Sequence, residues 1–302
     1  MDRAQAAFFK LASREQFGRL KRQAFQDWFC QVMSIAYPTD FEAVRLSQGD
    51  GGLDGFRLST SGVYQVYAPR DQKTREIVNK IEADISTARE YLKERKVEMR
   101  SWTFVHNDFD GLAPDVIAKL AEVTQANSNV TIERWSYEMM WQLLKSLDVE
   151  QLSELFGDGP TEANIESLEI PEIIPVIERL QRANPNPIPT VSFPDPEKLE
   201  HNGLSEECAD WLRLGERKES LVDACLKTNQ NPTAGEQIAE AFRRKYKELR
   251  GSNLRSDVIF QILWEFAGGE EFTSRQQHAA IAAVMSYFFH KCDIFENVPA
   301  KT

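Results

Sequence analysis

The chain has 302 residues, of which 42% are hydrophobic and 27% are charged, so it is long enough for two globular domains with separate cores. Its net charge of −11 argues against strong unassisted binding to nucleic acid, because phosphate contacts need lysine and arginine. No apolar run approaches the ~20 residues that cross a bilayer, and the first residues lack the pattern of a signal peptide, so we expect no membrane association.

The cysteines do not suggest a metal centre, and neither do the four histidines, which are scattered along the chain. Cys30, Cys208, Cys225 and Cys292 are widely spaced and form no CxxC pair, so neither a zinc site nor a disulfide framework is expected. A reducing, cytoplasmic location fits this cysteine usage best.

In the N-terminal half, helical and strand-like patterns alternate. A helix is predicted within residues 15–36 and ends before Pro38, and a strand is predicted at 41–46. After a glycine-rich turn at 48–55, the strands 56–58 and 63–67 read as a hairpin. The remaining elements are a helix at 73–96, a strand at 102–106, a helix at 114–125, a strand at 130–135 and a helix at 138–147. This order predicts an α/β fold with a mixed sheet flanked by helices, antiparallel early and parallel late.

The C-terminal half is predicted to be mainly helical. Prolines recur between residues 160 and 196, around a helix at 173–182, and we interpret residues 184–189 as an extended connector. Five further helices are predicted, at 205–214, 216–228, 234–249, 257–267 and 275–290. We therefore expect an α/β domain at 1–159, a connector at 160–196 and a helical domain at 197–302, whose aromatic residues mostly form its core.

The most informative stretch is Gly49-Asp-Gly-Gly-Leu-Asp-Gly-Phe56, followed by Tyr64-Gln-Val-Tyr-Ala-Pro69 and preceded by a helix that contains Gln26 and Asp27. It resembles the restriction-endonuclease-like branch of the PD-(D/E)XK nuclease superfamily, across roughly residues 15–157. The resemblance implies that Asp54 and Gln65 hold one or two Mg²⁺ or Mn²⁺ ions, and the carbonyl of Val66 is a natural third oxygen ligand. Metal-assisted cleavage of a phosphodiester then needs a positioned water and a nearby cation.

The chain departs from this family at the lysine, where it has Tyr67, a residue that is uncharged at neutral pH. Three interpretations stay open. Lys73 or Lys80 replaces the lost lysine from the following helix, Arg70 supplies the cation, or the domain keeps the fold without cutting.

Each candidate residue also has a plainer interpretation. Asp50 and Asp54 are both typical of hairpin turns, Asp50 more so. Glu42 is better explained as a solvated strand residue than as a ligand. Tyr64 and Tyr67 face opposite sides of the sheet, so at least one of them belongs to the core.

The basic residues have two interpretations as well. Arg70 and the cluster of Arg19, Lys21 and Arg22 are candidates for nucleic-acid contacts, although a basic cluster is most often a solvated helix face. His106, at the end of a predicted strand, is better explained as a structural histidine than as a catalytic one.

The C-terminal run Ser286-Tyr-Phe-Phe-His-Lys-Cys-Asp-Ile-Phe-Glu296, with the earlier His201-Asn-Gly-Leu-Ser205, is similar to the C-terminal helical region of bacterial ABC-three-component defence proteins, over approximately residues 195–297. The resemblance implies an ABC-type ATPase and a small middle component as partners, with this half as the docking part and the first half as the effector. The chain itself contains no GxxxxGK[ST] phosphate loop.

Three functions follow as hypotheses, of which the third is a pure assembly scaffold that binds no nucleic acid. In the first, the chain is a metal-dependent nuclease of an anti-phage system, acting on DNA or RNA and restrained by a partner ATPase. In the second, it is a catalytically inactive nuclease-fold module that binds nucleic acid or partner proteins. A homodimer is compatible with the first, because single-site nucleases often pair to cut both strands.

Overall fold

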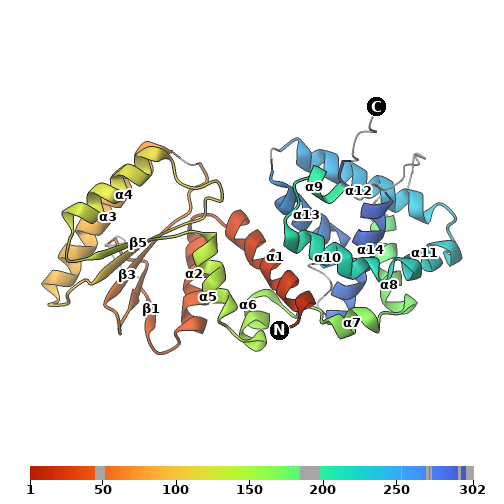
Figure 1. Cartoon of the computed structure of the whole chain (residues 1–302), viewed down its shortest axis with the longest axis horizontal. Helices are drawn as coiled ribbons and strands as arrows, with labels where there is room; N and C mark the ends of the chain where they lie inside the picture. The colour runs from red at the N-terminus through yellow and green to blue at the C-terminus, as the bar shows by residue number, and fades with distance from the viewer. Residues whose placement is uncertain are drawn as a thin grey trace. The chain divides into compact units, whose positions relative to one another are not determined.

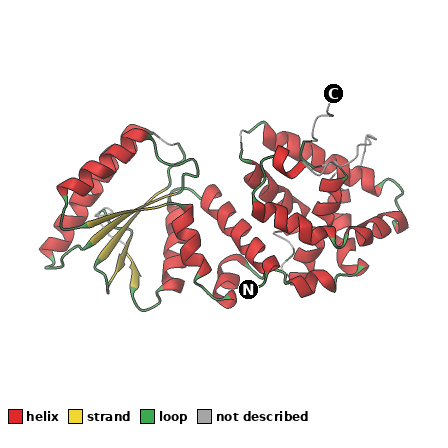
Figure 2. Ribbon diagram, viewed as in Figure 1, coloured by secondary structure: helices red, strands yellow, loops and turns green. Residues whose placement is uncertain are grey.

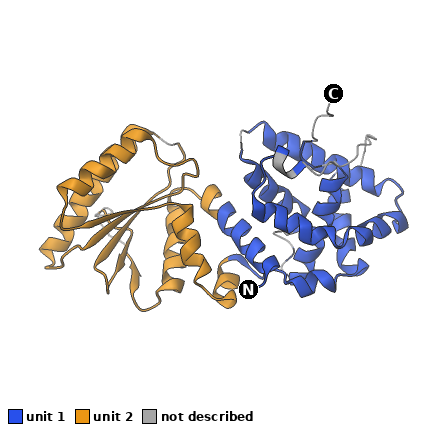
Figure 3. Cartoon of the chain, viewed as in Figure 1, with its two compact units in different colours: residues 1–15, 156–302 blue, residues 16–155 orange. Residues whose placement is uncertain are grey.

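The computed structural model describes residues 1–44, 52–71, 73–183, 198–252, 254–269, 272, 274–291 and 294–296. The chain divides into two compact units, residues 16–155 and residues 1–15 together with 156–302 (Figure 3). The domain boundaries expected at 159 and 196 stay a prediction. Residues 45 and 46 of the predicted strand, residues 48–51 of the turn predicted at 48–55 (with Asp50), the predicted connector at 184–189 and Cys292 lie outside the described residues.

The α/β unit contains the elements predicted for it in the predicted order (Figure 1). Its elements are α2 (Gln23–Ala36), β1 (Phe41–Ala43), β2 (Gly55–Arg57), β3 (Gly62–Tyr67), α3 (Thr74–Glu94), β4 (Ser101–His106), α4 (Pro114–Ala126), β5 (Thr131–Trp135) and α5 (Tyr137–Lys145), followed by α6 (Val149–Phe156).

The sheet has the strand order β1-β2-β3-β4-β5. The first two pairings are antiparallel, and β3, β4 and β5 run parallel, with Tyr67 opposite His106 in the β3–β4 register. The predicted mixed sheet is therefore confirmed. Parallel neighbours need a helical crossover, which α3 and α4 provide.

Helices cover both faces of the sheet (Figure 1). On one face, Val63 of β3 packs in a core with side chains of α3 and α4 such as Ile81 and Val116. On the other face, the ring of Tyr64 lies 5.6 Å from that of Phe29 in α2 and 5.3 Å from that of Trp135. The prediction that Tyr64 and Tyr67 face opposite sides is thus confirmed, and β3 is buried almost throughout.

The helix predicted over residues 15–36 is wrong in one respect, because it is two helices. α1 (Arg3–Arg19) ends before α2 begins at Gln23, and Arg22 has a positive φ of 53°. The reason is tertiary: the N–H of Arg22 donates to the carbonyl of Ala68 at 2.6 Å, and the carbonyl of Leu20 accepts from the side chain of Asn107 at 2.8 Å. These contacts replace the helical hydrogen bonds that an amphipathic pattern would otherwise predict.

The other unit is helical throughout its described part (Figure 2). Besides the first part of α1, it contains α7 (Glu162–Glu166), α8 (Ile170–Ala183), α9 (Lys198–His201), α10 (Glu206–Glu216), α11 (Glu219–Thr228), α12 (Ala234–Arg250), α13 (Ser256–Trp264), the π turn η1 (Glu265–Gly269) and α14 (Arg275–His290). The predicted helices are present, and α7 and α9 were not predicted.

α14 is the central helix of this unit and is buried along most of its length. Its small residues, from Ala279 to Ala283, let α10 approach closely: a Cβ added at Gly215 would lie 2.2 Å from the carbonyl oxygen of Ala282. The aromatic residues predicted to form the core largely do so, with Phe260, Phe288 and Phe289 buried. Within the described part of the chain, no helix combines the length and apolar character needed to cross a membrane.

Candidate functional site

Asp54 lies immediately before β2, with its side chain against β3. Its own N–H donates to the carbonyl of Tyr64 at 2.9 Å. One carboxylate oxygen, Oδ1, accepts from the side-chain amide of Gln26 in α2 at 2.8 Å, and Oδ2 accepts from the backbone N–H of Val66 at 2.6 Å. Asp54 is only 5% exposed, so these contacts stabilise a buried carboxylate rather than a solvated turn residue.

Gln65 is the next part of the site. It is 1% exposed, and its Oε1 has no hydrogen-bond partner among the described residues. Because the Val66 N–H that binds Asp54 belongs to the peptide bond after Gln65, the carboxylate lies beside this part of β3. An orphaned buried carbonyl is costly, and such positions often mark a functional role or a missing ligand.

The oxygens of Asp54, Gln65 and Val66 form a donor set that fits Mg²⁺ or Mn²⁺. These ions prefer hard oxygen ligands, need few carboxylates and retain several waters. Each carboxylate oxygen of Asp54 already accepts an N–H, and a carboxylate oxygen can accept more than one contact. Across the described ranges there is no group of three or more His, Cys, Asp or Glu side chains placed to hold a metal ion, so this set would rely on a single carboxylate.

Tyr67 stands where the family resemblance places a lysine. Its ring stacks on that of Phe104, with centroids 6.1 Å apart. Burial raises the pKa of Tyr67, and the nearby Glu76 raises it further, so the phenol stays neutral. It therefore cannot supply the missing positive charge.

The structure separates the two lysines proposed as replacements. Nζ of Lys80 lies 5.8 Å from the centroid of the Tyr67 ring and 2.8 Å from the carboxylate of Asp84, a mostly buried residue on the same helix. Lys73 is exposed and pairs with Glu76 at 3.1 Å, and this hydrogen bond raises its pKa. Both lysines act electrostatically on Tyr67, but only Lys80 has a described contact with its ring among these residues.

The predicted basic residues gather at the C-terminal ends of β3 and β4. Arg22 donates its N–H to Ala68, which directly follows β3, and Arg70 is exposed two residues further on. Burial lowers the pKa of Lys21, and Asp108 partly opposes this effect. Arg19 is exposed at the end of α1. Arg19, Arg22 and Arg70 are exposed, so the structure is compatible with a solvated surface, and their contact with nucleic acid stays a prediction.

Two further residues lie near the site. Gln26 of α2 donates from its side-chain amide to the carboxylate of Asp54, which its place in a predicted helix does not indicate. His106 is the β4 partner of Tyr67, is 3% exposed, and has an Nε2 with no hydrogen-bond partner in the part of the chain that is described; its interpretation as a structural histidine stays a prediction. Burial lowers the pKa of His106 to about 4, with the charge of Arg134 lowering it further. The only signal for it in the sequence was its place at a strand end.

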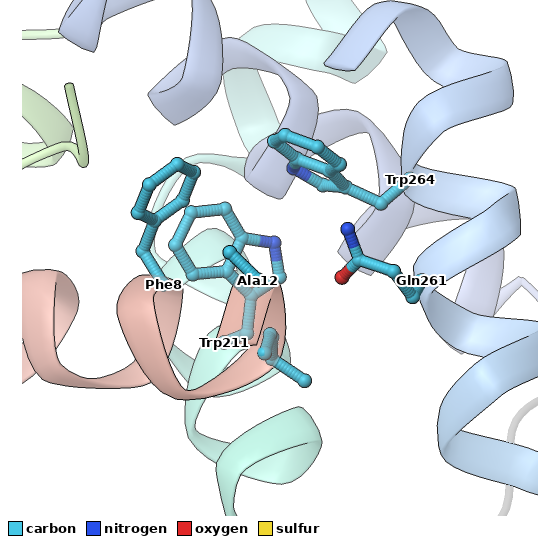
Figure 4. Close-up of a pocket in the computed structure, with 6 residues that line it drawn as sticks. Phe8, Ala12, Trp211, Gln261 and Trp264 are labelled. Atoms are coloured by element: carbon cyan, nitrogen blue, oxygen red, sulfur yellow. The ribbon is translucent and has the colours of Figure 1, made fainter. Parts of the chain in front are cut away.

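The helical unit contains a small cavity of about 10 Å³, lined by Phe8, Ala12, Trp211, Gln261 and Trp264 (Figure 4). This volume is close to that needed for one water molecule, and the lining is almost entirely apolar. The cavity is therefore a small gap in the packing of this unit and not a site for chemistry.

The helical half of the chain is similar to a known protein family. Residues 170–296 match the family model described as C-terminal domain 10 of the ABC-three component (ABC-3C) systems. Neither a curated protein nor a solved structure matches the chain. The α/β unit thus has no assigned family, whereas residues 170–296 form a C-terminal domain 10, and the chain is a component of a bacterial ABC-three-component defence system.

Proposed function

We propose that this chain is the nuclease effector of its ABC-three-component system, cleaving phosphodiester bonds of DNA or RNA with the help of Mg²⁺ or Mn²⁺. The carrying observation is the buried Asp54 carboxylate held against the Gln65–Val66 peptide, beside the unpartnered Oε1 of Gln65. The resemblance of residues 15–157 to PD-(D/E)XK nucleases supports the same proposal.

Each residue has a distinct task in this proposal. Asp54, Gln65 and the carbonyl of Val66 hold the ion, which would supply a bound water and positive charge near the phosphate. Gln26 and the N–H of Val66 fix the orientation of Asp54. Lys80 takes the role of the lysine that the family has at the position of Tyr67. The basic residues Arg19, Lys21, Arg22 and Arg70 bind the phosphate backbone.

System membership implies the other components as partners. We assign the docking of an ABC-type ATPase and a small middle component to residues 170–296, and control of cleavage to that ATPase. The net charge of −11 supports such an arrangement, because weak unassisted binding to nucleic acid leaves the effector dependent on a partner.

The test is cleavage of plasmid DNA and structured RNA by the full chain in Mg²⁺ or Mn²⁺, alone and with the partner components. Asp54→Asn preserves the size of the side chain but removes its charge, and we expect it to abolish cutting. Lys80→Met should reduce cutting by about 100-fold, in the range typical of a lost electrostatic contact to the transition state, and Lys80→Arg should restore part of it. Lys73→Met, with its exposed ion pair to Glu76, is the matched control and should stay within about twofold.

Cutting that survives in Asp54→Asn would refute the proposed site, and equal losses in the two lysine variants would refute the role of Lys80. Melting temperatures of all variants distinguish lost chemistry from lost folding, which matters because Lys80 also pairs with the mostly buried Asp84.

The second candidate function is an inactive module that binds nucleic acid or proteins. The observation in its favour is the neutral Tyr67 at the lysine position. If the chain cuts no substrate even with all components present, but binds nucleic acid, this second function replaces the first.

A further inference from the structure

A pocket of about 190 Å³ lies at the C-terminal ends of β4 and β5, apart from the Asp54 site. Its walls come from the loop between β4 and α4 and from the junction of β5 with α5. The polar and aromatic residues that line it include His106, Asp108, Phe109, Arg134, Ser136 and Glu138. Ligands of α/β folds commonly bind at the C-terminal ends of parallel strands.

The pocket contains both hydrogen-bond donors and acceptors. Nδ1 of the buried His106 accepts from the N–H of Asp108 at 3.3 Å, which places the proton of the neutral ring on Nε2. That Nε2 has no partner among the residues that are described. Ser136 precedes α5 without capping it through its side chain. On the acceptor side, Oδ1 of Asp108 accepts the N–H of Asp110 at 3.0 Å, and a carboxylate has further acceptor capacity.

These charges disfavour a bare anion as the occupant. Arg134 and the N-terminus of α5 are positive, but the carboxylates of Asp108 and Glu138 line the same pocket. A phosphate ion alone would therefore meet two negative groups within the site. A nucleobase suits the mixture better, since its edge both donates and accepts, and its face stacks on aromatic rings such as that of Phe109.

The size and the surroundings agree with this occupant. The volume is below the 300 Å³ or more typical of pockets for drug-sized ligands, so it suits a single base rather than a dinucleotide. The charge of the pocket residue Asp108 raises the pKa of Lys21, so Lys21 of the basic cluster lies near the rim of the pocket.

We propose that this pocket binds the base of one nucleotide, with Asp108 and His106 contacting the base edge, Phe109 against its face, and Arg134 beside its phosphate. The nucleotide is either part of a single strand or free. The inference takes its ligand class from the proposed function, but it requires no cleavage.

The test measures binding by the full chain without divalent metal, so that no strand is cut. The probes are a single-stranded octanucleotide, the four nucleoside monophosphates and inorganic phosphate. Arg134→Gln should weaken nucleotide binding roughly tenfold, as expected for a lost charged contact. Arg100→Gln removes an exposed arginine next to the opposite end of β4 and should stay within about twofold.

A second readout is the nitrogen NMR signal of the His106 side chain, which should shift on addition of nucleotide but not of phosphate. Tighter binding of the octanucleotide than of any monophosphate assigns the pocket to a strand, and the reverse assigns it to a free nucleotide. The proposal is overturned if phosphate competes as well as nucleotide, if no probe binds, or if Arg134→Gln and Asp108→Asn both bind normally. Because Asp54 plays no part in this measurement, a variant that binds but does not cut separates this proposal from the nuclease proposal.

Discussion

At the scale of single residues, burial decides which groups at the C-terminal ends of β3 and β4 carry charge. Tyr67 and His106 are neighbours on β3 and β4, and both are held neutral by their surroundings, the phenol by a raised pKa and the imidazole by a lowered one. Asp54 accepts hydrogen bonds from Gln26 and from the N–H of Val66, and Nζ of Lys80 lies 5.8 Å from the centroid of the Tyr67 ring. The chemistry proposed for this site therefore rests on one carboxylate, that of Asp54, and one ammonium group, that of Lys80.

His106 gives a pH dependence of stability with a definite sign. Its folded pKa is about 4, below the ~6.5 of an unfolded histidine, so the folded state binds fewer protons. The contribution is complete above pH ~6.5 and is lost as the pH falls toward 4. Between pH 7 and pH 5 we expect the free energy of unfolding to fall by about 2 kcal/mol through this residue.

Urea unfolding of the wild type and of His106→Gln at the two pH values checks this. The variant lacks the titrating ring, so its stability should decline less between pH 7 and pH 5 than that of the wild type. Equal declines in the two proteins would show that His106 is not responsible.

At the scale of elements, the periodicity of apolar residues predicted the helices and strands well, but not where neighbouring elements interrupt one another. The break between α1 and α2 exists because residues 20–22 bind the ends of β3 and β4. The close packing of α10 on α14 likewise depends on which residues face each other, and neither pattern alone indicates that Gly215 meets Ala282.

Gly215→Ala tests this packing. Its new Cβ would lie 2.2 Å from the backbone oxygen of Ala282, so one helix must shift, at an expected cost of about 1–3 kcal/mol. The control is Gly235→Ala in α12, where the nearest atom, a methyl of Leu226, lies at an ordinary 3.7 Å.

We expect the control to be neutral or up to about 1 kcal/mol more stable, because alanine favours helix more than glycine does. Thermal unfolding followed by circular dichroism measures both variants. A Gly215→Ala protein as stable as its control would contradict the close approach of α10 and α14.

At the scale of the whole molecule, an acidic chain carries four basic residues for which we propose contacts with nucleic acid. The net charge of −11 opposes approach to nucleic acid, whereas Arg19, Lys21, Arg22 and Arg70 are placed near the ends of β3 and β4. Residues 170–296 match a C-terminal domain of ABC-three-component systems, and we propose that they dock the other components. Targeting through partners therefore suits this chain better than independent binding.

The salt dependence of binding tests whether Arg19, Lys21, Arg22 and Arg70 contact nucleic acid. If these four residues contact phosphates, the logarithm of the affinity for a single strand should fall with the logarithm of salt concentration with a slope of about −3. Arg22→Gln should reduce the steepness of this slope by roughly 0.7, and Lys93→Gln, an exposed residue in the last turn of α3, should not change it. Fluorescence anisotropy between 50 and 200 mM salt gives both slopes, and an unchanged slope in Arg22→Gln would exclude that contact.

The sequence by itself determined the α/β class, the mixed sheet, the helical second half and its family, because alternating and helical apolar patterns and local motifs are written along the chain. It also predicted that Asp54 and Gln65 lie close to each other, since a hairpin brings adjacent strands side by side. Only the tertiary structure showed that Lys73 pairs with Glu76 and Lys80 with Asp84, placed Gln26 on Asp54, split the first helix and brought His106 beside Tyr67. Those outcomes depend on burial and on contacts between residues far apart in sequence, which no local pattern encodes.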